Sequence, residues 1–379
     1  MPTKNASGRK RAARASASAE TKKETGSPRS AAATAGRSDV PTQAAPVRKK
    51  ISLAFQGGGS HGAFTWGVVD RLLEDERIEI EGIVGTSAGA MNAAVTAYGL
   101  SKGGPARARQ ELANFWKRIS DEGRKGPLQP SWLDKMMGNG SLEFSPMWHM
   151  LDMVSRLMSP YQLNPFDLNP LRDVLLEVVD FEFMKHQNKV KLFLCATNVL
   201  TGRVKVFSHN DLSVNAVLAS GCLPFLFKAV EVNGEHYWDG GYMGNPPLFP
   251  LIYECESRDI LIVQINPINI PEVPTEAPAI FDRINTLSFN SSLMREMRVI
   301  QFVSQLVDQG DHRHKRVLIH TVDAEDVMGR MTVSSKLNPD WDHLLRLYGI
   351  GRERADAFLR MHFDDLNVRS STDIAAKFL

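Results

Sequence analysis

The sequence predicts an α/β fold in which helices pack on a mainly parallel central sheet. Two short runs, residues 51–55 and 80–84, have the length and apolar character of buried strands. Each run ends in a loop that contains glycine, and a segment with helical spacing of its apolar residues follows. The order strand, loop, helix, strand, turn, helix favours neighbouring parallel strands joined by crossover helices.

Spacing identifies the two helices that follow these strands. In the first, apolar residues recur at intervals of three and four, which is typical of an amphipathic helix. These residues are Phe64, Val68, Val69, Leu72 and Leu73. Residues 90–99 form a second predicted helix, built mainly of small side chains. Residues 100–185 combine Met, Trp, Pro and Asn with weak helical patterns, so we expect an insertion or lid over the core.

A second block of strands follows residue 185. These strands are predicted at residues 190–195, 204–207, 230–238 and 260–265. The pair Asn233-Gly234, set between alternating residues, is the strongest short signal for a hairpin. From about residue 280 onward the patterns are helical. We therefore expect a core at residues 50–265 and a mainly helical C-terminal extension at residues 266–379 that packs on it.

Charge and composition set the N-terminal segment apart from the rest. The 379 residues carry a formal net charge of +2. Residues 1–50 contain 12 Lys or Arg and 3 Asp or Glu, so they carry +9, and the other 329 residues carry −7. The first 50 residues contain no aromatic side chain. Such a segment buries too little apolar surface to offset its ordering entropy, so we predict a disordered basic tail at residues 1–49.

Three interpretations of the tail stay open. It is a solvated or tethering extension, an electrostatic anchor for a polyanion, or a transit peptide rich in Ala, Ser and Arg. Nine net positive charges would give weak binding that depends strongly on salt. We expect transient contact of residues 1–50 with an anionic membrane surface, and no specific nucleic acid partner.

Several classes of protein are excluded. No stretch approaches the roughly 18 consecutive apolar residues of a membrane helix. The basic N-terminus is not followed by the apolar segment of a secretory signal. Cys195, Cys222 and Cys255 are odd in number and widely spaced, which fits neither a disulfide framework nor a metal site. We expect a cytoplasmic protein without metal or cofactor, peripheral at membrane or lipid surfaces, and leave its oligomeric state open.

A glycine-rich motif follows the first predicted strand and opens the first helix. It consists of Gly57, Gly58, Gly59, Ser60, His61 and Gly62. Glycine lets the backbone turn sharply and brings N–H groups close to an anion, and the helix N-terminus adds positive potential. The spacing also matches the G-x-G-x-x-G of dinucleotide-binding proteins. That alternative needs an acidic residue at the end of the second strand, where Ser87 and its neighbours stand instead.

The second motif stands at the turn after the second strand. It consists of Gly85, Thr86, Ser87, Ala88 and Gly89. The motif matches G-x-S-x-G in the strand–turn–helix setting of a nucleophile elbow, where side chains two residues either side of the serine would collide with neighbouring backbone. A serine hydroxyl is a weak nucleophile, so it needs a base and donors that stabilise an oxyanion. Because parallel strands end at one sheet edge, we expect the amides of Gly58 and Gly59 beside Ser87.

Asp239 is the candidate base. It ends the predicted hairpin, after an aromatic pair, and precedes Gly240 and Gly241. Taken alone it would be interpreted as a turn-forming Asp, but a lone serine needs a base. An Asp with an ordinary pKa near 3.9 is a poor base at neutral pH. We therefore expect Asp239 to be partly desolvated or to make a very short hydrogen bond to Ser87.

In order, spacing and context, the three motifs resemble those of the patatin-like phospholipase family. Residues 57–62 resemble its glycine-rich oxyanion loop, residues 85–89 its nucleophile elbow, and residues 239–241 its Asp-Gly-Gly/Ala motif. Residues 219–224 resemble the family segment ahead of the catalytic Asp, and the resemblance spans about residues 51–265.

The resemblance implies a three-layer α/β/α fold, a Ser–Asp dyad without histidine, and metal-independent hydrolysis of lipid acyl esters. Carried over, Ser87 would be the nucleophile, Asp239 the base, and the loop from Gly57 to Gly62 the oxyanion hole. The family often has Asp before the glycines and Arg two positions after them, whereas this chain has Gln56 and His61. We interpret His61 as a capping or packing residue, with contact to an anionic head group or to the oxyanion as the alternative.

Two alternatives to the dyad enzyme stay open. One is a Ser-Asp-His triad of the α/β-hydrolase kind, for which five later histidines are available. They are His312, His314, His320, His343 and His362. The other is a non-catalytic scaffold that binds lipid or polymer granules in the same pocket. Residues 131–158, rich in Met and Trp, suit either an apolar surface around an acyl chain or the core of the insertion.

Overall fold

The computed structural model describes residues 48–379, apart from residues 138, 139, 188 and 312. The tail predicted at residues 1–49 lies outside the described residues except for its last two, and so does its expected membrane contact. His312 also lies outside them. In the described part of the chain, we find no helix with both the length and the apolar character needed to cross a bilayer.

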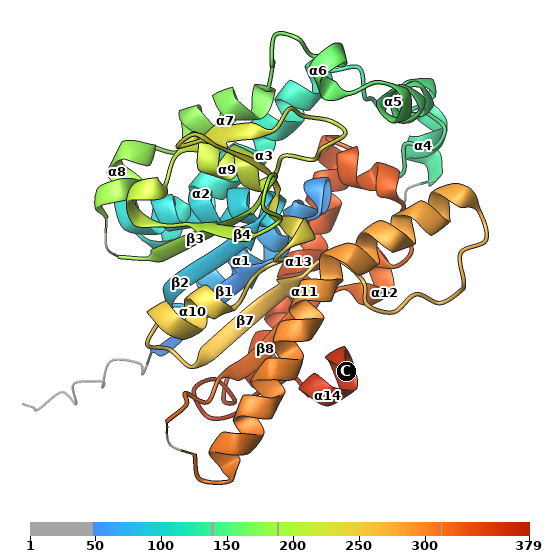
Figure 1. The fold of residues 1–379 in the computed structure, drawn as a ribbon. Coiled ribbons are helices and arrows are strands. Elements are labelled where there is room, and N and C mark those ends of the chain that lie inside the picture. The colour runs from blue at the N-terminus through green and yellow to red at the C-terminus, as the bar shows by residue number, and fades with distance from the viewer. Residues whose placement is uncertain (1–47, 138–139, 188, 312) are drawn as a thin grey trace, which may run out of the picture. The chain divides into compact units, whose positions relative to one another are not determined.

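Eight strands of the described residues form one sheet (Figure 1). In chain order they are β1 Lys49–Phe55, β2 Ile78–Thr86, β3 Lys191–Asn198, β4 Val204–Phe207, β5 Val230–Val232, β6 Glu235–Asp239, β7 Asp259–Gln264 and β8 Leu318–Asp323. Their order across the sheet is β5-β6-β3-β2-β1-β7-β8, and β4 pairs with β3. The strands from β3 to β8 in this order are parallel, and β4, β5 and β6 pair antiparallel. The predicted, mainly parallel sheet is confirmed.

Helices fill most of the remaining described chain. The α-helices are α1 Gly62–Glu74, α2 Ala88–Gly103, α3 Pro105–Lys125, α4 Trp132–Met137, α5 Pro146–Leu157, α6 Pro160–Leu163, α7 Pro170–Val178, α8 Phe181–His186, α9 Val214–Ser220, α10 Phe249–Glu254, α11 Ala277–Asp308, α12 Glu325–Met328, α13 Trp341–His362 and α14 Ile374–Phe378. The short 3-10 turns are η1 Gly59–His61, η2 His209–Asp211, η3 Gly240–Tyr242 and η4 Val333–Leu337.

Alternate residues of the central strands face opposite helix layers, because successive side chains of a strand point to opposite faces. On β1, Leu53 packs in a cluster with α1, α2, α3, α9 and α13, whereas Ala54 packs in a cluster with α10, α11 and α14. On β7, Leu261 and Ile262 divide in the same way. Figure 1 shows α11 crossing the near face of the sheet, whereas α1 and α2 lie on the far face. The fold is therefore a three-layer α/β/α sandwich.

Most of the predicted elements are present where spacing placed them. β1, α1, β2 and α2 follow in the expected order, and Asn233 and Gly234 join β5 to β6 with φ of 53° and 80°. Positive φ at both positions is what a two-residue hairpin turn requires. β8 was not predicted, because its apolar run is interrupted by His320. The His320 side chain is fully buried. A hydrogen bond between its Nε2 and Oδ1 of Asp259, at 2.9 Å, compensates for the lost contact with water.

The segment predicted as an insertion, residues 100–185, consists of a first part within the helix layer and a later part made of short helices. Its first part is α3, which packs against α1 and α2 in one helix layer. The short helices α4, α5 and α6 lie further along it. The division of the chain into a core, an insertion and a C-terminal extension stays a prediction.

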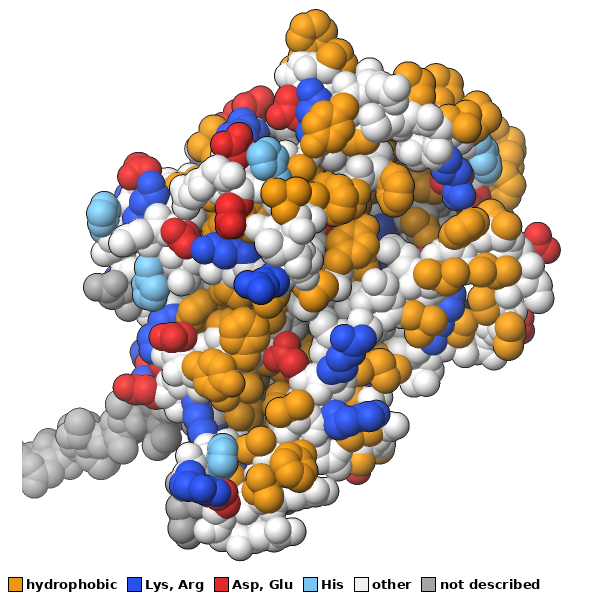
Figure 2. All heavy atoms as spheres, in the orientation of Figure 1, with side chains coloured by type: hydrophobic (Ala, Val, Ile, Leu, Met, Phe, Trp, Pro, Cys, Tyr) orange, Lys and Arg blue, Asp and Glu red, His pale blue; other side chains and the backbone are white. Residues whose placement is uncertain are grey.

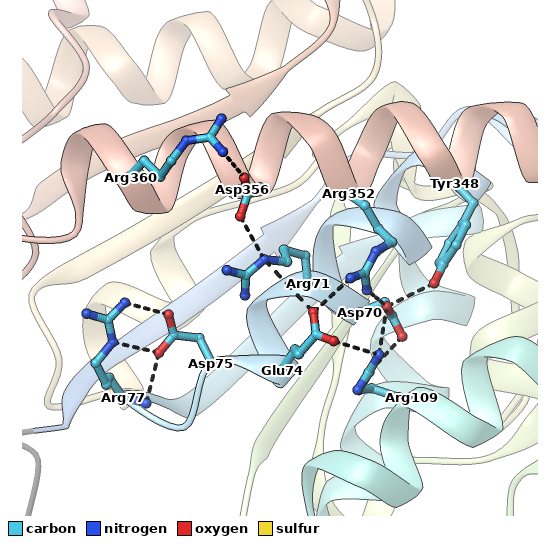
Figure 3. Close-up of polar contacts among 10 residues, drawn as sticks. All are labelled: Asp70, Arg71, Glu74, Asp75, Arg77, Arg109, Tyr348, Arg352, Asp356 and Arg360. Carbon is cyan, nitrogen blue, oxygen red and sulfur yellow. Dashed lines mark hydrogen bonds and ion pairs between the residues drawn. The ribbon is translucent and has the colours of Figure 1, made fainter.

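A network of charged side chains joins α1 to α3 and α13 (Figure 3). Asp70 of α1 is 4% exposed and accepts hydrogen bonds from Arg109 Nε at 2.8 Å and from the Tyr348 hydroxyl at 2.9 Å. Arg352 of α13 pairs with both Asp70 and Glu74. Helix α13 thus packs against α1, and Asp70 is the centre of the contact.

Replacing Asp70 by Asn should destabilise the protein by about 2–3 kcal/mol. Removing one partner of a buried ion pair costs roughly 3–5 kcal/mol, and here the two arginines keep some solvent exposure and the Glu74 contact. Urea unfolding measures the difference. The control is Asp356→Asn, which removes two more exposed pairs, one with Arg71 across the contact and one with Arg360 within α13. It should change stability by less than about 1 kcal/mol. Equal effects of the two changes would contradict the prediction.

Candidate active site

Ser87 lies at a strained turn between β2 and α2. Its φ is 56° and its ψ is −125°, a backbone conformation that a non-glycine residue rarely adopts and that recurs at nucleophile elbows. A Cβ at Gly85 would lie 2.3 Å from the carbonyl oxygen of Gly89. A Cβ at Gly89 would lie 2.4 Å from the carbonyl oxygen of Phe55. A side chain at either position would therefore collide with neighbouring backbone, which is the reason expected for the two glycines.

Strand register brings the three motifs to one edge of the sheet. Phe55 pairs with Gly85, so β1 and β2 end side by side. Thr86 in turn pairs with Cys195 of β3, and the next residue of β3 pairs with Asp239. The glycine loop touches the elbow, because a Cβ at Gly57 would lie 2.6 Å from the Cβ of Ser87. The parallel core thus assembles loop, serine and aspartate from segments far apart in the sequence.

Asp239 is fully buried, as the base hypothesis expects. Burial raises its pKa to about 7, against the opposing effects of the Gly241 N–H and the Ser87 hydroxyl. Oδ1 accepts the Gly241 N–H at 2.8 Å, whereas Oδ2 makes no fully formed hydrogen bond to any described residue. The contact with Ser87 therefore does not have the geometry of an ordinary hydrogen bond. Catalytic hydrogen bonds are often long before the substrate binds and tighten in the Michaelis complex.

The amides of the glycine loop are not equivalent. Gly57 N–H donates to Oδ1 of Asn245 at 2.7 Å, and the amides of His61 and Gly62 donate to carbonyls within the loop. Among the described residues, the amides of Gly58 and Gly59 have no acceptor. These are the two amides that the sequence analysis expects beside Ser87. Ser60 continues the loop as the middle residue of η1.

Buried amide side chains hold the loop in place. Gln56 is fully buried, and its Oε1 accepts the backbone N–H groups of Ile265 and Asn266, each at 2.9 Å. Nδ2 of Asn266 donates to the Gly57 carbonyl at 2.7 Å. Asn245 and Asn266 were not predicted as site residues from the sequence. Each precedes a proline just after a strand or base motif, and Asn-Pro dipeptides mark turns, which is a signal that could have found them.

Ser220 and Asn92 also position the motifs and were not singled out. Oγ of Ser220, at the end of α9, accepts the Ser87 N–H at 2.9 Å. Asn92 of α2 donates from Nδ2 to the Gly62 carbonyl at 3.0 Å. These two contacts join the elbow to the family-like segment 219–224 and to the end of the glycine loop.

His61 packs inside the protein. It is 2% exposed, and its Nε2 lies 2.7 Å from the Ser335 hydroxyl in η4. Burial lowers its pKa well below the ordinary value, and Lys336 and His343 lower it further. His61 is therefore neutral at physiological pH. This geometry supports the packing interpretation over direct contact with an anionic head group.

Comparison with known proteins agrees with these motifs. A family model described as patatin-like phospholipase matches residues 53–252, more than half of the chain. No curated protein matches the sequence significantly. Within the described part of the chain, no three His, Cys, Asp or Glu side chains are grouped so that they could hold a metal ion.

Two solved structures resemble the fold at low identity. VipD from Legionella pneumophila is 16% identical with a TM-score of 0.39, over 84% of this chain and 68% of that one. A chain of the complex of full-length ExoU and SpcU from Pseudomonas aeruginosa is 17% identical with a TM-score of 0.30. That match covers 83% of this chain and 53% of the other, and at these scores neither likeness bears on function. On the extent of the family match, which contains all three motifs, the chain belongs to the patatin-like phospholipase family.

Proposed function

We propose that this protein is a serine acyl hydrolase that cleaves carboxylic esters of lipids through a Ser87–Asp239 dyad. The observation that carries the proposal is the fully buried carboxyl of Asp239, whose pKa of about 7 is influenced by the Ser87 hydroxyl. A base with this pKa is half deprotonated near neutral pH, where a general base works best. Family membership supports lipid hydrolysis as the class of reaction.

The reaction would proceed in two steps. Asp239 takes the proton of Ser87 as the hydroxyl oxygen attacks the ester carbonyl, and the resulting oxyanion accepts hydrogen bonds from Gly58 and Gly59. Collapse expels the alcohol, which takes the proton, and leaves an acyl group on Ser87. Water then attacks this acyl group as Asp239 takes its proton. The bond to Ser87 Oγ breaks, Oγ recovers that proton from Asp239, and the fatty acid is released.

The positions of the later histidines support the dyad over a Ser-Asp-His triad. His320 bonds Asp259 and Ser371, and Asp259 begins β7, at the sheet edge opposite Ser87. His314 pairs with Asp311, and His362 with Asp365. His343 lies beside His61 with a ring distance of 6.2 Å. None of these four described histidines has a hydrogen bond to Ser87 or Asp239.

An exposed apolar surface supports a lipid as the substrate. Figure 2 shows hydrophobic side chains gathered over α4, α5 and the first turns of α11. No residue of α5 is buried, so the core-of-the-insertion interpretation does not hold for this helix. The exposed side chains include Trp132, Met136, Met150, Met153, Leu157, Phe281 and Ile284. Cζ of Arg156 lies 5.1 Å from the centre of the Phe281 ring, and this contact joins α5 to α11.

The apolar surface continues toward Ser87. Tyr161 of α6 accepts a hydrogen bond from the Ala229 amide, and Phe225 in the same loop is 67% exposed. This loop starts at Gly221, where a Cβ would lie 3.8 Å from Oγ of Ser87. An acyl chain bound at Ser87 would therefore meet flexible, apolar side chains on leaving the site.

Ser87→Ala tests the proposal. The purified protein should hydrolyse p-nitrophenyl butyrate and react with a fluorophosphonate, and the Ser87→Ala variant should lose roughly 10³-fold or more of its hydrolysis and all labelling. Ser101→Ala is the matched control, because Ser101 is a buried serine near the other end of the same helix. Wild-type protein that binds lipid vesicles but hydrolyses no ester would favour the scaffold instead.

A further inference from the structure

A half-buried lysine from the C-terminal part of the chain touches the glycine loop. Lys336 lies in η4, and a Cβ at Gly59 would lie 2.2 Å from the Lys336 carbonyl oxygen. The two backbones are therefore in direct contact. Nζ of Lys336 donates to Oδ1 of Asn266 at 3.3 Å. The neutral His61 brings no charge to the loop, so the cation beside it comes from η4.

Asn266 links this lysine to the loop. The side chain is 2% exposed, and its two ends have different partners. Oδ1 accepts from Lys336, while Nδ2 donates to the Gly57 carbonyl at 2.7 Å. An amide side chain bonded at both ends has one orientation, because a flip would place its oxygen against the Gly57 carbonyl.

The Gly57 carbonyl and the Gly58 N–H belong to one peptide group. This peptide is trans, so its C=O and its N–H point in opposite directions. A hydrogen bond to the carbonyl oxygen increases the polarity of the N–H at the other end, since chained hydrogen bonds polarise one another. The Gly58 N–H has no acceptor among the described residues. Its free donor is therefore aimed away from Asn266.

Lys336 stands at the far end of this chain of hydrogen bonds, and its charge depends on burial and on Asp282. Burial lowers the pKa of Lys336, and the nearby Asp282 carboxylate opposes that change. Burial also raises the pKa of Asp282, which Lys336 and Arg283 oppose. Each group thus favours the charged form of the other.

We propose that Lys336 and Asn266 form a relay that orients and polarises the Gly57–Gly58 peptide, which makes Lys336 a positioning residue for the Gly58 oxyanion donor. The inference rests on the proposed function, in which Gly58 binds the oxyanion. It predicts an effect confined to the transition state, because the relay touches no ground-state atom of the substrate.

Three variants and a control test the relay. Lys336→Met removes the charge with an unbranched side chain one atom shorter, Lys336→Arg keeps the charge, and Asn266→Asp removes the donor to the Gly57 carbonyl. Lys135→Met is the control, because it removes one exposed lysine that pairs with Asp340. For each protein, kcat and KM for p-nitrophenyl butyrate, the inhibition constant of a trifluoromethyl ketone and Tm are measured. The ketone forms a reversible adduct whose oxyanion would lie at Gly58.

Lys336→Met should lower kcat about 10-fold, less than the roughly 10²–10³-fold loss of a direct oxyanion donor, with KM changed less than about twofold. Binding of the ketone should weaken by the same factor as kcat. Lys336→Arg should recover most of the loss, and Asn266→Asp should lose at least as much as Lys336→Met. Unchanged kcat and ketone binding in Lys336→Met would overturn the relay. Equal losses of kcat in Lys336→Met and Lys336→Arg, each accompanied by a lower Tm, would also overturn it, because they would show a structural role.

A measurement that needs no hydrolysis separates the relay from the proposed function. In glycine-labelled protein, Lys336→Met should move the amide nitrogen resonance of Gly58 upfield, and Lys135→Met should leave it in place. If the wild type shows no Ser87-dependent hydrolysis but the Gly58 resonance responds, the proposed function fails and the polarised peptide stands. If hydrolysis depends on Ser87 and the resonance does not respond, the relay fails alone.

Discussion

Replacing Asp239 by Asn should abolish ester hydrolysis, and the wild-type rate should fall about tenfold for each pH unit below about 7. Burial holds the pKa of Asp239 near 7, and only the deprotonated carboxylate can accept the Ser87 proton. Asn keeps the acceptor for the Gly241 N–H but cannot take a proton, so the loop geometry should survive. The pH dependence of kcat/KM with p-nitrophenyl butyrate measures the acid limb.

Glu296 provides the control for this limb. Burial raises the pKa of Glu296 to about 7 as well, but its carboxylate accepts the backbone N–H groups of Leu248 and Phe249. Glu296→Gln should therefore leave the acid limb in place. Loss of the limb in Glu296→Gln, or full activity in Asp239→Asn, would rule out Asp239 as the base.

The same desolvation makes a prediction about stability. The pKa of Asp239 is about 7 in the folded protein and near 3.8 when the chain unfolds. Between pH 3.8 and pH 7 the folded state binds more protons than the unfolded state, so the free energy of unfolding falls as pH rises. The full loss of stability is present above pH 7. Asp239→Asn should therefore unfold at a higher temperature than the wild type at pH 8. The gain should shrink as pH is lowered toward 5.

Gly89→Ala should destabilise the protein by about 3 kcal/mol and remove its activity. The new Cβ would lie 2.4 Å from the Phe55 carbonyl and 2.7 Å from the Gln56 carbonyl, and backbone atoms of a central strand have little room to move. Any shift would separate α2 from the end of β1, where the glycine loop starts. Thermal unfolding and p-nitrophenyl butyrate hydrolysis measure the two effects.

Gly349→Ala is the matched control, because Gly349 is also helical and a Cβ there meets nothing within 4 Å. Alanine in an open helical position stabilises by roughly 0.4–1 kcal/mol. The two substitutions add the same methyl group in a helix, so a difference in sign isolates the contact with β1. A Gly89→Ala protein as stable as the wild type would show that α2 can move away from the strand.

Local patterns were sufficient for the elements that carry the motifs. The spacing around Val68 and Leu72 predicted α1, and Asn233-Gly234 predicted the hairpin that leads to Asp239. β8 was not predicted because His320 interrupts its apolar run. This histidine is buried through long-range hydrogen bonds to Asp259 and Ser371. The roles of Ser87, Asp239 and the glycine loop stay predictions.

By itself, the sequence determined the α/β class, the parallel sheet and the three motifs, because strand period, helix period and glycine turns are local properties of the chain. The tertiary structure alone decided that Asp239 is fully buried, with a pKa of about 7. It also decided that Gly58 and Gly59 keep free amides while Asn245 occupies that of Gly57, and that Lys336 reaches the loop through Asn266. Desolvation and hydrogen bonding depend on what surrounds a group in space, and residues far apart in the sequence supply those surroundings.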